Sequence, residues 1–256
     1  MTICIGIRAH DGVVIAADAQ ETLGDFKRHT QKILPFCGPI GLGNNPQTPT
    51  MACLFTGAGE AGYLDAFFDF ALKDINTGLN GTEFEKFLSE KTRTFHETHL
   101  FPLASSPNRP EIEVLIGSFC LWGTSMFVTY GSTLRRVAPI AAVGIGAHFA
   151  QSVMSELPYP QDVNHAELIA AYAIAATKEH IEGCGNYTTI YTLHNSTIVE
   201  GESGQGSHLV RPTQLFTHVS QRKIRKWEES FGDRWARRQT DLIAELIEEE
   251  LASDEF

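Results

Sequence analysis

The second residue of the chain offers the most reactive chemistry at one position. It is threonine, and a small residue there permits removal of the initiator methionine. A terminal threonine carries a hydroxyl nucleophile together with a free α-amine, whose ordinary pKa lies close to neutral pH. That amine can accept the hydroxyl proton directly or through a water molecule. While Met1 remains attached, the nitrogen of Thr2 is an amide and cannot act as a base. A Met-Thr start alone is common and carries little information.

Other catalytic motifs are incomplete. The GIG at 144–146 lacks the third glycine of a dinucleotide-binding turn, and the sequence has no P-loop lysine. The HETH at 96–99 has the wrong spacing for a helical zinc site, which favours an exposed polar helix end. Ser203 does not lie in a GxSxG motif. The sequence therefore gives no support to nucleotide binding, a metal site or a Ser-His-Asp hydrolase.

The elements around Thr2 are predicted to be strands. Ile3, Ile5 and Ile7 alternate with other residues at the period of a strand, and a turn follows at 10–12. Residues 13–17 are apolar throughout, which predicts a second strand that is buried on both faces.

The rest of the chain falls into blocks of strands and blocks of helices. Apolar spacing and turn residues first predict a strand at 32–36, a loop at 37–51, a strand at 52–56 and helices over 64–72 and 84–95. Strands at 112–119, 125–129 and 135–143 follow. The last predicted elements are a helix at 149–157, a helix whose capping box is Asn164 with Glu167, and strands at 188–193 and 197–200. Such segregated blocks favour stacked sheets with helices packed outside, an α+β class, over an alternating parallel fold.

Composition excludes several classes of protein. The 256 residues include 20 Lys+Arg and 31 Asp+Glu, a net charge of −11 that would repel a phosphate backbone, so we expect no nucleic-acid partner. The longest nearly uncharged apolar stretch, 138–150, is too short to cross a bilayer, and no leader segment is recognised. The five cysteines are odd in number and never spaced as CxxC, which is typical of reduced thiols. We therefore expect a cytoplasmic protein without a membrane partner.

Three separated segments resemble a known family. The strand that bears Thr2, the DG turn, VVIAADAQETLG and QKILPF resemble the start of proteasome β-subunits and, more closely, of bacterial HslV-type peptidases. The resemblance continues through FTGAGEAGYLDAF at 55–67 and VGIGAHFAQSVMSEL at 143–157, and covers roughly residues 2–193. It implies an N-terminal-nucleophile hydrolase, a four-layer αββα sandwich that cleaves peptide bonds with a terminal threonine and without a metal or organic cofactor.

The resemblance also implies roles for individual residues. Thr2 would be the nucleophile, and Lys32 would place its positive charge beside the threonine hydroxyl. Asp18, at the end of the second strand, would hold and neutralise Lys32. Gly57 matches the glycine whose backbone N–H binds the tetrahedral oxyanion.

Four further positions match those that contact substrate in this family. Thr22 and Gly59 would pair with an extended substrate backbone, as an added strand does. Glu21 and Phe55 match the walls of the pocket for the residue before the scissile bond. There Glu21 would favour a basic side chain, and Phe55 would make the pocket shallow.

Each residue taken singly also has a simpler interpretation. Asp18 could cap a turn, Lys32 could be a solvated charge on an edge strand, and Gly57 could precede a helix.

Two departures from the family pattern bear on activity. Ile145 stands where members usually carry a serine near the threonine amine, and residues 182–184 read Glu-Gly-Cys where an acid and a serine are expected. These changes make the surroundings of the amine less polar.

Organisation changes after residue 200. We predict a proteasome-like hydrolase domain at 1–200 and a C-terminal extension at 201–256 that starts with the linker GESGQGS. Residues 219–238 carry seven Lys/Arg, and residues 241–256 carry seven acids and no base. A solvated helix is the simpler interpretation of this tail, and a contact with another subunit or a partner is the alternative.

The sequence thus predicts a cytoplasmic threonine endopeptidase that degrades unfolded polypeptides. The family encloses its active sites, which implies a self-compartmentalising homo-oligomer, a ring or a helical assembly. Because the chain has no ATP-binding motif, any energy dependence would need a separate ATPase unfoldase. Two alternatives stay open: a proteasome-like amidase or transpeptidase with a dedicated substrate, and a catalytically silent assembly subunit.

Overall fold

The computed structural model describes most of the chain. The described residues are 2–23, 26–38, 51–75, 79, 81–106, 109–120, 123–137, 139–195 and 215–235. Several predicted features lie outside these ranges: Met1, most of the loop at 37–51, the strand at 197–200, Ser203 with its linker, the proposed domain boundary at 200, and the acidic tail at 241–256.

One five-stranded sheet contains the N-terminal strands. Its order is β10 (Ile140–Gly144), β1 (Ile3–Arg8), β2 (Gly12–Asp18), β11 (Thr188–His194) and β12 (Phe216–His218), and all neighbours are antiparallel. Every residue of β2 is buried. The prediction of two consecutive strands, the second buried on both faces, is confirmed.

A second five-stranded sheet faces the first. Its order is β5 (Leu34–Cys37), β6 (Met51–Gly59), β7 (Ile112–Cys120), β8 (Gly123–Tyr130) and β9 (Thr133–Val137), again antiparallel throughout. The strand predicted at 135–143 is wrong, because β9 and β10 are separate strands in different sheets. Pro139 lies between them, where it has no N–H to offer a continuous ladder.

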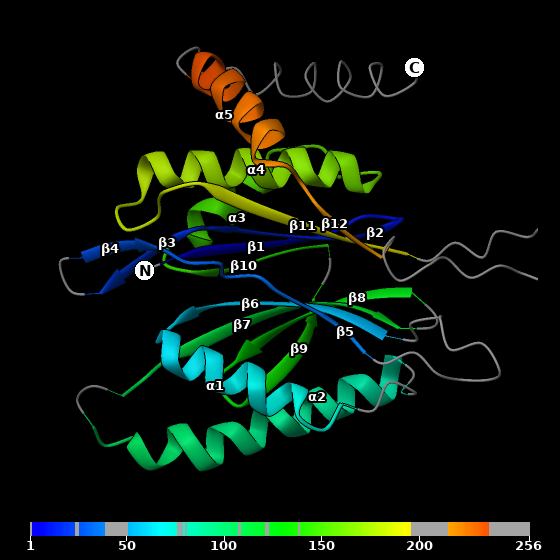
Figure 1. Cartoon of the computed structure of the whole chain (residues 1–256), viewed down its shortest axis with the longest axis vertical. Coiled ribbons are helices and arrows are strands. Elements are labelled where there is room, and N and C mark those ends of the chain that lie inside the picture. Colours follow the sequence, from blue (N-terminus) through cyan, green and yellow to red (C-terminus); the bar gives the residue numbers. More distant parts are fainter. Residues whose placement is uncertain are drawn as a thin grey trace, which may run out of the picture.

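A small hairpin projects beside the start of β1 (Figure 1). It consists of β3 (Gln20–Leu23) and β4 (Phe26–His29), paired from Gln20 with His29 to Leu23 with Phe26. The sequence predicts a turn at 22–25 but no strands on either side of it, because QETL and FKRH are mostly polar and lack a clear apolar alternation.

Five α-helices lie in the described part of the chain. They are α1 (Ala61–Leu72), α2 (Gly81–Phe95), α3 (Ala147–Ser155), α4 (Val163–His180) and α5 (Gln221–Trp235). A π-helical turn, His96–Leu100, and a short 3₁₀ helix, Phe101–Leu103, follow α2. The predicted start of α4 is corrected: Asp162 caps it by accepting a hydrogen bond from the His165 N–H at 2.9 Å, whereas Glu167 is buried and accepts one from Thr192 at 2.5 Å.

Helices cover the outer faces of the two facing sheets (Figure 1). Helices α3 and α4 lie over the first sheet with α5 beyond α4, and α1 and α2 lie over the second. Three buried apolar clusters fill the molecule, one under each helical layer and one between the sheets. Trp227 and Phe231 of α5 belong to the same cluster as Ile5 of β1, so residues beyond 200 contribute to the core of the preceding residues.

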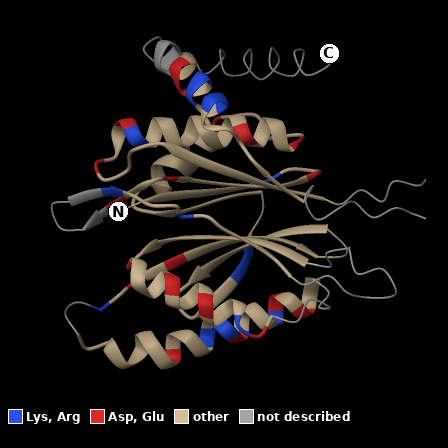
Figure 2. Ribbon diagram, in the orientation of Figure 1, with Lys and Arg blue, Asp and Glu red and all other residues tan. Residues whose placement is uncertain are grey.

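Charged residues in the described structure are carried mainly by the outer helices (Figure 2). The helices that can be described are all too short or too polar to cross a bilayer.

The two sheets approach closely at Gly117 of β7. A Cβ atom added there would lie 2.9 Å from Val13 Cγ1 and 3.3 Å from Ile15 Cγ1, both on β2. Glycine therefore allows the facing sheets to pack at this distance.

We expect Gly117→Val to lower the free energy of unfolding by about 1–3 kcal/mol, because its side chain must displace the facing residues of β2. Urea unfolding followed by circular dichroism measures this. Gly62→Ala is the matched control: it lies in α1 with nothing within 4 Å of an added Cβ, and alanine favours a helix. Unchanged stability of Gly117→Val would contradict the close contact between the sheets.

Candidate active site

Two strands and the segment before a third bring Thr2, Asp18 and Lys32 together. Thr2 directly precedes β1, and Asp18 is the last residue of β2. The antiparallel register pairs Cys4 with Ala17, which puts the beginning of β1 beside the end of β2. Lys32 lies two residues before β5, in the second sheet. The site therefore lies at the edge where the two sheets meet.

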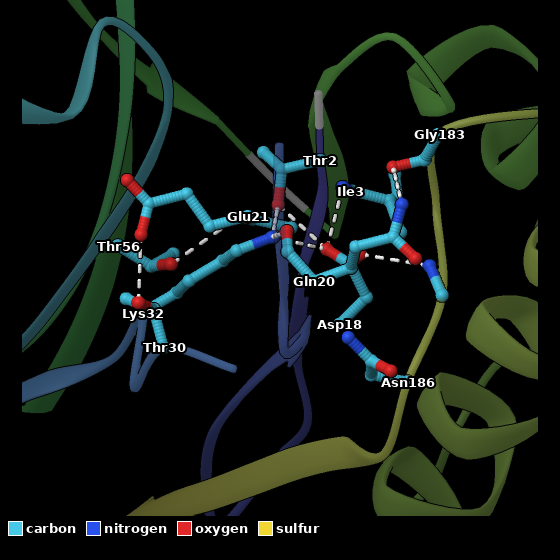
Figure 3. A network of polar contacts seen from close by, with 12 residues as sticks. Thr2, Ile3, Asp18, Gln20, Glu21, Thr30, Lys32, Thr56, Gly183 and Asn186 are labelled. Carbon is cyan, nitrogen blue, oxygen red and sulfur yellow. Dashed lines mark hydrogen bonds and ion pairs between the residues drawn. The ribbon is translucent and has the colours of Figure 1, made fainter. Parts of the chain in front are cut away.

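The three side chains form one polar cluster (Figure 3). The Thr2 hydroxyl donates to Asp18 Oδ1 at 2.6 Å, and the Lys32 ammonium pairs with the same oxygen at 2.7 Å. The ammonium also contacts Thr2 Oγ1 and donates to the carbonyl oxygen of Gln20. Because the Lys32 side chain is only 10% exposed, it is not the solvated charge of the simpler interpretation.

Backbone N–H groups complete the surroundings of the buried Asp18 carboxylate. The Ile3 N–H donates to Oδ1 and the Gly185 N–H donates to Oδ2, each at 3.0 Å. Gln20 Nε2 donates to the carbonyl of Gly183 in the same loop, at 3.2 Å. A buried carboxylate needs such partners, since leaving it unpaired would be costly. Sequence reasoning missed Gln20 and Gly185, because no motif marks either of them.

Gly57 lies inside β6 and lines the same cavity as Thr2 and Lys32. A Cβ atom there would lie 2.6 Å from the Glu113 carbonyl oxygen, so glycine is required by space. The Cys4 thiol donates to the Gly57 carbonyl at 3.3 Å and accepts from Thr56 at 3.1 Å. Burial raises the pKa of Cys4 to about 11, which keeps this thiol protonated as a donor. These contacts hold the Gly57 peptide in place.

The cavity has a volume of about 610 Å³. Its lining includes Glu21 and Gly59, two of the four residues predicted to contact substrate. Phe55 is fully buried and packs against Phe68, which is the aromatic residue that lines the cavity. Thr22 belongs to β3, and its side chain lies outside the described part of the structure.

The positions that depart from the family pattern lie close to the cluster. Gly144 has a φ of +98°, and an added Cβ would lie 2.3 Å from the Thr2 carbonyl oxygen. Its neighbour Ile145 is 53% exposed, and its side chain has no hydrogen-bonding group. Cys184 is buried, which raises the pKa of its thiol to about 12, while Glu182 is exposed. The polar groups around Thr2 therefore come mainly from Asp18 and Lys32. Among the described residues, no cluster of His, Cys, Asp and Glu could hold a metal ion.

Comparisons with known proteins identify the fold. No protein-family model matches the sequence, and no curated protein matches it. Among solved structures, a Gly-1 mutant of Anbu from Hyphomicrobium sp. strain MC1 has a TM-score of 0.67 and 12% identity, with 93% of this chain and 96% of that chain covered. Anbu from Yersinia bercovieri, described as an ancestral β-subunit, has a TM-score of 0.67 and 13% identity over 92% and 95%. The helical assembly of the Anbu complex from Pseudomonas aeruginosa gives 0.65 and 14% over 92% and 96%. The chain therefore has an Anbu-like fold.

We expect Asp18→Ala to lower the free energy of unfolding by about 3–5 kcal/mol, because it leaves the Lys32 ammonium partly buried without its carboxylate. Urea unfolding of Asp18→Ala, Lys32→Met and the double variant measures the coupling, and the double variant should recover part of the loss.

The matched control is Glu85→Ala, which breaks the exposed pair with Arg136, whose side chains are 38% and 45% exposed. It should cost less than about 1 kcal/mol. Equal losses for Asp18→Ala and Glu85→Ala would contradict the importance of the buried cluster.

Proposed function

We propose that removal of Met1 makes this chain a threonine-type peptidase of the proteasome/HslV superfamily. The observation that carries the proposal is that the Thr2 hydroxyl contacts both the Lys32 ammonium and the Asp18 carboxylate on the wall of a large cavity. The Anbu-like fold supports the proposal. The two facing sheets between helical layers support it too, because N-terminal-nucleophile hydrolases are αββα sandwiches.

Activation of the nucleophile would use groups of Thr2 and its neighbours. Once Met1 is removed, the α-amine accepts the proton of the hydroxyl, directly or through a water molecule. The Lys32 ammonium stabilises the negative charge that develops on Oγ1, and Asp18 keeps that ammonium oriented and neutralised. Proton transfer by a positioned base contributes about 10²–10⁴-fold to the rate.

The chemical steps then follow those of acyl transfer. Oγ1 attacks the substrate carbonyl carbon, and the Gly57 N–H donates to the oxyanion, a donor worth about 3–4 kcal/mol. Collapse of the tetrahedral intermediate breaks the C–N bond, and the terminal ammonium returns its proton to the leaving amine. The α-amine of Thr2 then takes a proton from a water molecule that attacks the ester. Release of the carboxylic acid restores the hydroxyl.

An extended polypeptide is the substrate that suits this cavity. Thr22 on β3 and Gly59 on β6 belong to the strand edges along which a substrate backbone would pair, as in strand addition. An unfolded polypeptide readily offers an extended and unpaired backbone of this kind. Glu21 would contact the side chain before the scissile bond.

Such a protease would have to be enclosed within an assembly to spare other proteins in the cytoplasm. One structural neighbour is described as a helical assembly of the Anbu complex, which supports a homo-oligomer for this chain. A separate ATPase could then deliver unfolded substrate.

A catalytically silent assembly subunit is the second candidate function. Ile145 favours it, because the half-exposed side chain beside Gly144 supplies no hydroxyl where the related peptidases place one near the amine. The two candidates differ in whether Thr2 reacts.

Labelling with a peptide vinyl sulfone distinguishes them. We expect protein purified from cells to lack Met1 by mass spectrometry and to form an adduct on Thr2. Thr2→Ala should abolish the adduct, and Lys32→Met should slow its formation by about a hundredfold or more, as loss of an electrostatic donor does. Lys86→Met, on the exposed face of α2, should label at the wild-type rate.

An intact Met1 together with no adduct would contradict the peptidase and favour the silent subunit. If Thr2 does label, digestion of casein would identify a general peptidase, whereas turnover of short amides alone would identify an amidase.

A further inference from the structure

The β3–β4 hairpin places an arginine in the same cavity as Glu21. Arg28 of β4 pairs with Glu21 of β3 across the hairpin, and both residues line the cavity that contains Thr2. Arg28 Nε lies 2.7 Å from Glu21 Oε2, and Arg28 Nη2 lies 3.1 Å from Oε1. This two-point contact is the geometry with which a guanidinium recognises a carboxylate.

Both oxygens of the Glu21 carboxylate accept hydrogen bonds from within the protein. The Thr30 hydroxyl also donates to Oε2, at 2.7 Å. The pKa of Glu21 is lowered, chiefly by the hydrogen bond from Arg28, so this carboxyl is ionised at neutral pH. Its side chain is 12% exposed, which limits the water that can replace these partners.

Arg28 itself contributes little to the core. Its side chain is 61% exposed. The hydrogen bond to Glu21 raises the pKa of the guanidinium, and Asp65, which also lines the cavity, adds to this attraction. Replacing Arg28 should therefore leave the fold intact while changing the charge on the cavity wall.

We propose that Arg28 is a specificity-determining residue. It pairs with the Glu21 carboxylate where a basic substrate side chain would otherwise bind, so that this pocket accepts uncharged side chains. The inference rests on the proposed peptidase function. A substrate arginine would have to exchange one guanidinium for another, with no net gain in hydrogen bonds. Arg28 is tethered to the same hairpin and therefore competes at a high effective concentration.

Without Arg28, the pocket would prefer a basic substrate side chain. Lys32 is paired with Asp18, so among the described lining residues Glu21 and the exposed acids Glu60 and Asp65 would then outnumber the cations. Exposed acids are screened by salt, whereas the less exposed Glu21 can bond directly to a basic side chain. The preference for a basic residue expected from Glu21 is thus a property of the chain lacking Arg28.

Two peptide vinyl sulfones that differ only in a terminal Arg or Leu test this on the processed full-length protein. Wild type should label no faster with the Arg probe than with the Leu probe. Arg28→Leu should raise the Arg/Leu ratio of labelling rates by about tenfold or more, the effect of one hydrogen-bonded charge pair. Adding Glu21→Gln to Arg28→Leu should remove that gain, and Arg28→Lys should give an intermediate ratio.

Arg136→Leu is the matched control, since it removes an exposed arginine that pairs with Glu85 outside the cavity. Its ratio should equal that of wild type, and circular dichroism confirms folding of each variant. An Arg preference in wild type that Arg28→Leu leaves unchanged would overturn the role of Arg28 alone. Failure of every variant, wild type included, to label with either probe would overturn the proposed function and this inference with it.

Discussion

The structure depends on the burial of one carboxylate. Asp18 is completely buried, and it accepts hydrogen bonds from the Thr2 hydroxyl, the Lys32 ammonium and the backbone N–H groups of Ile3 and Gly185. These donors come from the beginning of β1, the segment before β5 and the loop after α4. A buried charge is tolerated only when it is paired and hydrogen-bonded. The requirement to satisfy Asp18 therefore holds three distant segments together around the Thr2 hydroxyl.

Sheet geometry makes that meeting possible. Antiparallel pairing of β1 with β2 puts Thr2 next to Asp18, and the facing sheet supplies Lys32 and the glycine of β6, Gly57. The cavity lies beside the small β3–β4 hairpin, which contributes Gln20, Glu21 and Arg28 to its lining. The sheets thus position the reactive hydroxyl, while Glu21 and Arg28 of the hairpin set the charge that a substrate meets.

Local patterns in the sequence predicted local structure well. Alternation of apolar residues predicted β1, a continuous apolar run predicted β2, and helical spacing predicted α1 and α2, because each of these signals reflects which faces of an element are buried. The chemistry of Thr2 was visible directly, whereas grouping it with Lys32 and Asp18 required the family resemblance. Periodicity could not predict that β9 and β10 belong to different sheets, because it marks strand-like residues and not the neighbouring strand with which each one pairs. Gly185 was missed because its N–H reaches Asp18 only through the tertiary fold.

The central claim is that one residue, Thr2, supplies both the attacking oxygen and the base that activates it. A crystal structure of protein purified from cells and treated with a peptide epoxyketone tests this most directly, because that reagent closes a ring only with a hydroxyl and a free amine on the same residue. We predict a ring that includes Oγ1 and the nitrogen of Thr2, with the Lys32 ammonium beside it. An unmodified Thr2 with Met1 still attached, or Lys32 and Asp18 turned away from Thr2, would contradict the account.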